Sequence, residues 1–293
     1  MGGLPRTQRV AAYAVVVRDE QVLLSRLAPR LSRSELWTLP GGGLEHGEDP
    51  RDAVVREVHE ETGLDVRVGD TSRVYSQRQR RDRRGGRRVD SWSLRIVYEG
   101  WVPRDAPAPR VVEVDGTTVD AAWHPLAAVR SGRVRVSALV REALADHTPA
   151  RRQRVGAYAL VTRAGGAQVL LTRISARGHH AGCWTLPGGG VDHGEAPRDA
   201  VRRELAEECG LAGVVGDVVA VDDVHLAGTA PSGRHEDFHG VHLVFRAEVD
   251  PDVAPRVVEA DGTTDAVAWV DVAEVEAGAV EVLEVVRAAL TRR

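Results

Sequence analysis

Three glutamates recur at the same spacing at two places in the chain. Glu57, Glu60 and Glu61 lie in the stretch VREVHEETG, and an equivalent set follows 147 residues later. Residues three and four apart share one side of an α-helix, so each set predicts a helical face with three carboxylates. Like charges at this spacing weaken an isolated helix by roughly a few tenths of a kcal/mol per pair. A hard divalent cation such as Mg²⁺, which takes oxygen ligands, would offset the repulsion.

A run of three glycines precedes each acidic set, at Gly41–Gly43 and at Gly188–Gly190. Glycine lets the backbone approach a ligand closely, and its carbonyls are open to a cation. Because Mg²⁺ prefers carboxylates combined with substrate phosphates, the two features together predict metal-assisted chemistry on a phosphate compound. The alternative is a solvated acidic helix face. The fixed glycines, the neighbouring arginine and the duplication argue against it.

The residues around the first acidic set predict where its helix begins and ends. Asp49 is a favourable N-cap, and Pro50 suits the first helical position. Val54, Val58 and Thr62 would form a narrow inner stripe, and Gly63 would end the helix as a C′ residue. The second copy has Ala196 in place of the aspartate and keeps Pro197, Val201, Leu205 and Gly210.

The repeat extends over the whole chain, which has 293 residues. QRVAAYAVVVRDEQVLLSR matches QRVGAYALVTRAGGAQVLLTR, WTLPGGG occurs twice, and VVEVDGTTVDAAW matches VVEADGTTDAVAW. A period of a whole domain indicates a tandem duplication rather than a solenoid. We expect domains at residues 1–148 and 149–293, with the join in the polar stretch ADHTPARRQR. The short join predicts that the two domains pack as an intramolecular pseudo-dimer, and a homodimer of the chain is left open.

Each half reads as a mixture of strands and helices. VAAYAVVV and QVLLSR predict a β-hairpin, WTLPGGG a loop, SLRIVYEGWV a further strand, and SALVREAL a closing helix. This mixed order indicates an α/β (α+β) fold. The net charge of −4 gives no reason to expect nucleic-acid binding. No apolar run is long enough for a membrane span or a signal core, so we expect a cytoplasmic protein.

At these residues the chain resembles the Nudix hydrolases, whose box is G-x5-E-x7-R-E-U-x-E-E-x-G-U with U aliphatic. The match in the first half is Gly42, Glu48, Arg56, Glu57, Val58, Glu60, Glu61, Gly63 and Leu64, and in the second half Gly189, Glu195, Arg203, Glu204, Leu205, Glu207, Glu208, Gly210 and Leu211. The resemblance implies two α/β/α sandwich domains, each with a mixed sheet and a box helix. It also implies an Mg²⁺- or Mn²⁺-dependent pyrophosphatase that cleaves a nucleoside diphosphate linked to another moiety.

The resemblance also implies a role for each matching residue. The metal ligands would be Gly41, Glu57, Glu60 and Glu61 in the first half, and Gly188, Glu204, Glu207 and Glu208 in the second. Glu57 and Glu204 are the candidate catalytic bases. Arg56 and Arg203, paired with Glu48 and Glu195, would orient the glutamates.

Two questions stay open from the sequence. Members of the family often need a carboxylate from a later loop, and the repeated ExDGTT segment offers Glu113, Asp115, Glu259 and Asp261; a tight turn explains the segment equally well. The substrate is a small phosphate compound of unresolved identity. It could be a nucleotide, a nucleotide sugar, or an isoprenoid or sugar-linked diphosphate, and one half could be an inactive nucleotide sensor.

Overall fold

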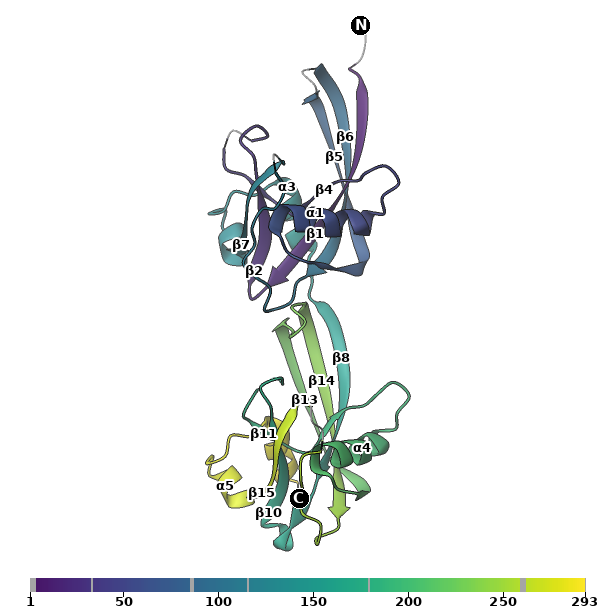
Figure 1. The fold of residues 1–293 in the computed structure, drawn as a ribbon, viewed down its shortest axis with the longest axis vertical. Coiled ribbons are helices and arrows are strands. Elements are labelled where there is room, and N and C mark those ends of the chain that lie inside the picture. The colour runs from purple at the N-terminus through teal and green to yellow at the C-terminus, as the bar shows by residue number, and fades with distance from the viewer. Residues whose placement is uncertain are drawn as a thin grey trace. The chain divides into compact units, whose positions relative to one another are not determined.

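The computed structural model describes residues 4–32, 34–84, 87–114, 116–178, 180–258 and 262–292, without the side chains of residues 79–88. The chain divides into two compact units. The first comprises residues 1–150 with 227–237, and the second comprises residues 151–226 with 238–293. Figure 1 shows strands and helices mixed in both parts of the chain. Within the described residues, no helix is long and apolar enough to cross a membrane.

Seven strands of the first half are joined into one sheet by a long central strand, β1 (Arg6–Arg18). At its end β1 forms a hairpin with β2 (Gln21–Leu27), and along its length it runs parallel to β6 (Arg87–Trp101). Strand β6 pairs with β5 (Arg67–Arg84), and β2 pairs with β7 (Thr118–Pro125). Parallel and antiparallel pairs make this a mixed sheet.

Helices cover both faces of this sheet (Figure 1). Even-numbered β1 residues such as Ala12, Ala14 and Val16 pack with α1 (Pro50–Thr62), whereas odd-numbered Val15 and Val17 pack with α2 (Leu126–Arg130) and α3 (Ala138–Asp146). This separation follows from the alternation of side chains along a strand. The result is the predicted α/β/α sandwich.

The second half repeats the arrangement with its central strand interrupted. Strand β8 (Ala150–Leu160) and the short β9 (Thr162–Arg163) together correspond to β1. Strand β8 lies between β12 (Gly188–Gly190) and β14 (His235–Val249), with β13 (Gly213–Thr229) beyond β14. Strand β9 pairs with β10 (Gln168–Ile174), which also pairs with β11 (Trp184–Thr185) and β15 (Thr264–Asp271). The helices are α4 (Pro197–Cys209), α5 (Val272–Glu276) and α6 (Glu284–Leu290), and η1 (Ala164–Gly166) is a 3₁₀ turn.

The predicted loop WTLPGGG is the main difference from the secondary structure expected from the sequence. It forms two short strands, β3 (Trp37–Thr38) and β4 (Gly41–Gly43), and β4 is antiparallel to β1. Glycine and proline predict a turn from local preference alone, whereas these glycines are held by pairing with residues about thirty positions earlier. The hairpin, the later strand and the closing helix at SALVREAL are confirmed.

Candidate active site

Local residues set the bounds of the box helix, as the sequence predicts. The Asp49 side chain accepts a hydrogen bond from the Arg51 backbone N–H at 2.8 Å, and Gly63 ends α1 with a φ of 67°. Val54, Val58 and Thr62 are fully buried. In the second half Ala196 makes no side-chain cap, while Gly210 ends α4 in the same left-handed conformation. The helix therefore presents a fixed outer face beside the glycine strand.

Arg56 organises the carboxylates of the first half. Its Nε and Nη2 donate to the two oxygens of Glu48, at 2.8 and 3.0 Å. Its Nη1 lies 3.2 Å from both Glu57 Oε1 and Glu60 Oε2, and Nη2 also donates to the Gly43 carbonyl at 3.3 Å. Its hydrogen bonds lower the pKa of Glu48 to about 2, so this carboxylate stays ionised and holds the guanidinium in place.

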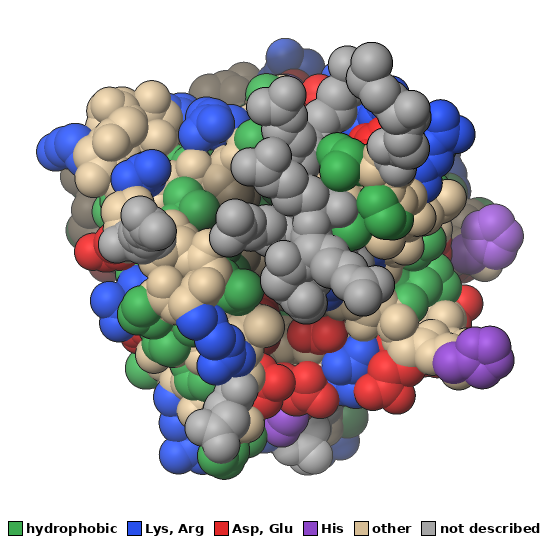
Figure 2. Space-filling model, turned by 90° about the horizontal axis from the view of Figure 1, so that it is seen from above, with side chains coloured by type: hydrophobic (Ala, Val, Ile, Leu, Met, Phe, Trp, Pro, Cys, Tyr) green, Lys and Arg blue, Asp and Glu red, His purple; other side chains and the backbone are tan. Residues whose placement is uncertain are grey.

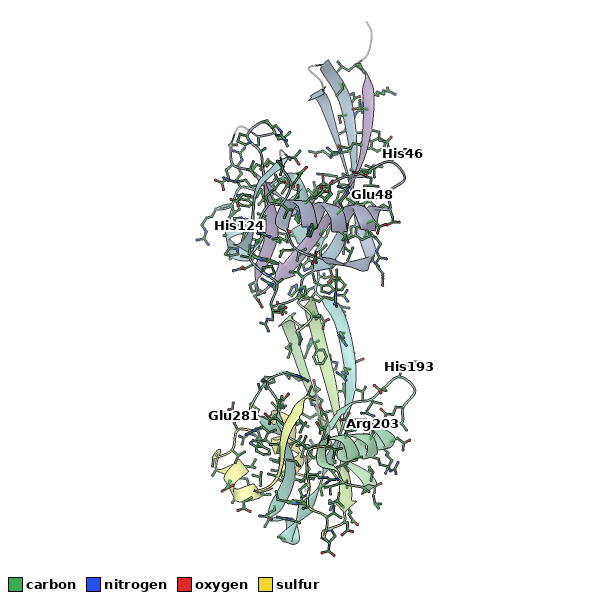
Figure 3. All side chains as sticks on the ribbon, viewed as in Figure 1. His46, Glu48, His124, His193, Arg203 and Glu281 are labelled. Carbon is green, nitrogen blue, oxygen red and sulfur yellow. The ribbon has the colours of Figure 1, made fainter. Side chains whose placement is uncertain are left out.

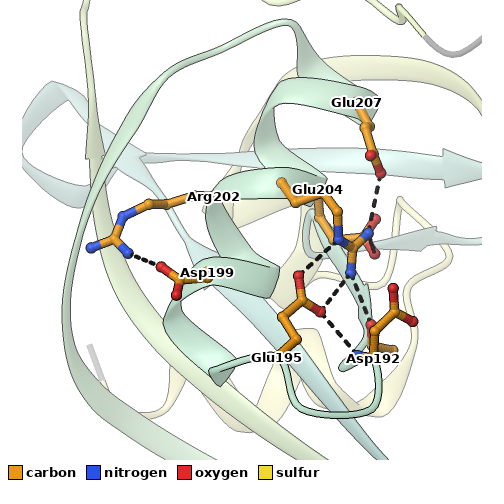
Figure 4. Close-up of polar contacts among 8 residues, drawn as sticks. Asp192, Glu195, Asp199, Arg202, Glu204 and Glu207 are labelled. Carbon is orange, nitrogen blue, oxygen red and sulfur yellow. Dashed lines mark hydrogen bonds and ion pairs between the residues drawn. The ribbon is translucent and has the colours of Figure 1, made fainter.

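The second half repeats this array through Arg203. Figure 4 shows the glutamates of the array, Glu195, Glu204 and Glu207. Arg203 Nε and Nη2 donate to Glu195 at 2.9 and 3.1 Å, and its Nη1 donates to Glu204 at 2.7 Å and to Glu207 at 3.2 Å. Figure 3 shows Arg203 on α4 in the second half and Glu48 beside α1 in the first. The orienting role expected for the two arginines therefore has the same geometry in both copies.

Glu61 differs from its two neighbours because it is turned into the interior. Its side chain is only 2% exposed, and its oxygens accept hydrogen bonds from the Gly41 backbone N–H at 3.0 Å and the Thr118 hydroxyl at 2.5 Å. Burial raises its pKa to about 7. In the second half Glu208 accepts the same bonds from Gly188 and Thr264. The three carboxylates of the expected face therefore differ in solvent exposure, from the buried Glu61 to the more exposed Glu60.

Glu57 lies against the glycine strand. A Cβ placed on Gly42 would overlap its carboxylate, and the same holds for Gly189 and Glu204. Burial raises the pKa of Glu57, although the neighbouring Arg56 opposes this change. A partly buried carboxylate with a raised pKa is a better proton acceptor near neutral pH than a solvated one.

The carboxylates provide the hard oxygen donors that Mg²⁺ prefers. Glu57 and Glu60 converge on a single atom, Arg56 Nη1, so the two can face one cation. Across the described part of the chain, however, no three His, Cys, Asp or Glu side chains are grouped closely enough to hold a metal ion by themselves. Mg²⁺ is commonly bound through one or two carboxylates plus substrate phosphates, so this donor set fits such a metal without a closed protein cage. Figure 2 shows acidic side chains gathered on one face of the molecule with basic ones among them.

Of the later-loop candidates, only Glu113 lies in the described residues. Its charge contributes to the raised pKa of Glu57, and its backbone N–H donates to the Glu60 carbonyl at 2.9 Å. Asp115, Glu259 and Asp261 lie outside the described residues. The repeated segment also supplies Thr118 and Thr264, which bind the buried glutamates and which we did not predict from the sequence.

Comparison with known proteins places most of the chain in one family. The NUDIX domain model matches residues 7–143 and again residues 152–289. The nucleoside triphosphatase NudI of Salmonella heidelberg is 35% identical over 83 residues, which cover 27% of this chain and 58% of that protein. The chain thus spans somewhat more than half the length of the curated relatives it matches.

Solved structures give similar matches. A MutT NUDIX hydrolase from Burkholderia pseudomallei is 32% identical with a TM-score of 0.38, and the match covers 48% of this chain and 98% of that protein. A MutT protein from Methanosarcina mazei is 25% identical with a TM-score of 0.39, covering 50% and 95%. Since the two domain matches together span most of the sequence, the chain belongs to the Nudix family and carries two Nudix domains.

Proposed function

We propose that both halves hydrolyse the pyrophosphate bond of a nucleoside diphosphate linked to another moiety, and that both require Mg²⁺ or Mn²⁺. The observation that carries the proposal is the duplicated array of one arginine and three carboxylates beside a glycine strand. Neither copy has lost a member of this array. A ligand sensor derived from such an enzyme would have no need to keep both arrays intact.

The metal would be held by Glu57 and Glu60, with Glu61 and the Gly41 carbonyl completing its surroundings, and by Glu204, Glu207, Glu208 and Gly188 in the second half. When bound, it neutralises charge on the phosphate oxygens. Glu57, or Glu204, accepts a proton from water while the water oxygen bonds to one phosphorus. The bond from that phosphorus to the bridging oxygen breaks, and the other phosphate leaves with that oxygen. Glu48 and Glu195 keep the arginines in position during this step.

The relatives favour nucleotides as the substrate class, because NudI is described as a nucleoside triphosphatase. The test is a screen of nucleoside triphosphates, ADP-ribose, dinucleotides and prenyl diphosphates, with Mg²⁺ and with excess chelator, measuring phosphate products. We expect nucleotide turnover that stops in chelator and returns with Mg²⁺ or Mn²⁺. Turnover of prenyl diphosphates alone would replace the nucleotide assignment. Undiminished turnover in chelator would reject the metal site, and binding without turnover would indicate a sensor.

A further inference from the structure

A second arginine stands beside the glycine strand in each half, on the side away from the box helix arginine. Arg9 of β1 places its guanidinium against Gly43, so that a Cβ on this glycine would lie 2.9 Å from Arg9 Nη2. Arg154 of β8 lies against Gly190 even more closely. The third glycine of each run is therefore needed for the close approach of a cation, not only for backbone conformation.

Arg9 and Arg154 both have exposed side chains. Within the described residues neither guanidinium makes an ion pair or a side-chain hydrogen bond. In contrast, Arg51, Arg56, Arg78 and Arg95 of the first half each pair with an acidic side chain. A guanidinium has five N–H donors in a planar fork that suits phosphate oxygens. Such a fork, with no acidic partner among the described residues, is available to an anion.

The position of this arginine relative to the glutamates supports a role in the same site. Strand β4 contacts both β1 and α1. The Glu57 side chain therefore lies against Gly42, and the Arg9 side chain lies against Gly43. Burial raises the pKa of Tyr13, and the charges of Arg9, Glu61 and Glu57 all act on its hydroxyl. In the second half burial raises the pKa of Tyr158 to about 12, and the charges of Arg154, Glu208 and Glu204 act on it likewise. Cation and carboxylates thus flank one short strand in both copies.

We propose that Arg9 and Arg154 bind the phosphate group of the diphosphate that the carboxylates and their metal do not hold. This proposal rests on the proposed function and extends it by naming a further substrate contact. A diphosphate has two phosphate groups, each with anionic oxygens that accept hydrogen bonds. The arginine on the other side of the glycine strand supplies positive charge and directional donors for the second. No other described residue beside β4 presents an unpaired cation in both halves.

The test uses one active half at a time. Arg9→Ala is made in a full-length chain whose second site is disabled by Glu207→Gln and Glu208→Gln. We expect KM for the best substrate of the screen to rise about 10–100-fold, as expected for loss of a charge-assisted hydrogen bond, with a much smaller change in kcat. Inhibition by inorganic pyrophosphate should weaken in parallel. Arg9→Lys keeps the charge but not the fork and should restore part of the affinity.

A second variant displaces the Arg9 guanidinium by a change in the neighbouring glycine strand. Gly43→Ala places a methyl group where the guanidinium lies, and Gly43 does not have a left-handed φ, so the strand tolerates it. It should raise KM in the same direction as Arg9→Ala. Arg6→Ala, which removes an equal charge from an exposed position on the same strand, is the control and should leave KM unchanged. The matching variants in the second half are Arg154→Ala and Gly190→Ala, with Arg152→Ala as control.

Unchanged KM and unchanged pyrophosphate inhibition in both Arg9→Ala and Gly43→Ala would overturn the proposal. Absence of hydrolysis in the unmodified chain would instead reject the proposed function. In that case, calorimetric titration with inorganic pyrophosphate and Mg²⁺ decides the role of the arginine. Binding by the unmodified chain that is weakened in Arg9→Ala supports the role, and equal binding, or none, refutes it.

Discussion

Replacing Thr118 by valine should destabilise the first domain by an amount that depends on pH. Valine keeps the β-branched shape but removes the hydroxyl that donates to Glu61 Oε1 at 2.5 Å. Glu61 is 2% exposed, so water cannot readily replace the lost donor. An unsatisfied buried group costs more than a simple lost contact, and more again when that group is charged.

The magnitude follows from the raised pKa of Glu61. The pKa is about 7 in the folded chain against an ordinary value of 4.5, so between these pH values the folded state keeps a proton that the unfolded chain has lost. Stability contributed by this group therefore falls as pH rises through that window, by about 3 kcal/mol at most. At pH 8 the carboxylate is ionised, and Thr118→Val should cost about 1.5–3 kcal/mol. At pH 5 it is protonated, and the cost should be about 0.5–1.5 kcal/mol.

The assay is urea unfolding at pH 5 and pH 8 in chelator, followed by tryptophan fluorescence. Thr264→Val is the matched variant, since its hydroxyl donates to Glu208 in the same way. Glu61→Gln removes the titrating group, so in that background Thr118→Val should have the same cost at both pH values. Equal losses at both pH values in the chain with Glu61 intact would refute the reasoning.

Three further predictions concern the site and its helix. A chain with Glu60→Gln and Glu61→Gln, and another with Glu207→Gln and Glu208→Gln, should each retain part of the hydrolysis with an altered ratio between substrates; if one loses all turnover and the other none, only one half is an enzyme. Gly42→Ala should lower turnover of the first site at least tenfold with little change in melting temperature, because the added methyl group displaces the flexible Glu57 carboxylate rather than backbone. Gly41→Ala should instead impair folding, as circular dichroism would show, because Gly41 has a φ of 139° and an added Cβ would meet the β1 backbone. Gly63→Ala should lower the free energy of unfolding by about 1 kcal/mol, since φ is 67° there; an unchanged urea midpoint would contradict the capping argument.

The sequence predicts this protein best where structure depends on near neighbours. Asp49, Pro50 and Gly63 act within one helical turn of the residues they cap, so their roles can be read directly. The pairing of Arg56 with Glu48 also lies within a short segment, and the family resemblance implies it.

The remaining features depend on contacts between residues far apart in the chain. Thr118 binds a glutamate 57 positions earlier, and Arg9 meets a glycine on a strand whose pairing no local preference predicts. In the sequence Arg9 is one arginine among 39 basic residues, and nothing in its immediate neighbours distinguishes it. The burial of Glu61 likewise follows from the position of the sheet relative to α1, which helical periodicity alone does not give.

The hairpin between β1 and β2 has a consequence for how the two copies have diverged. In the first copy it closes through Asp19 and Glu20, both with positive φ, at 48° and 56°. Such two-residue turns favour Asn-Gly or Asp-Gly, so Glu20 occupies a position that suits glycine. The second copy has two extra residues here, with Gly165 and Gly166 in the left-handed region, and its strand is interrupted before the turn.

One copy thus keeps a two-residue turn with positive φ at Asp19 and Glu20 on an unbroken strand, and the other has a longer turn, with positive φ at Ala164 as well as at two glycines, on an interrupted strand. After a duplication, the length of the turn and the continuity of the central strand can change independently in each copy. For an engineer, the first turn is the natural place to gain stability, since glycine at position 20 would release the strain without touching the glutamates.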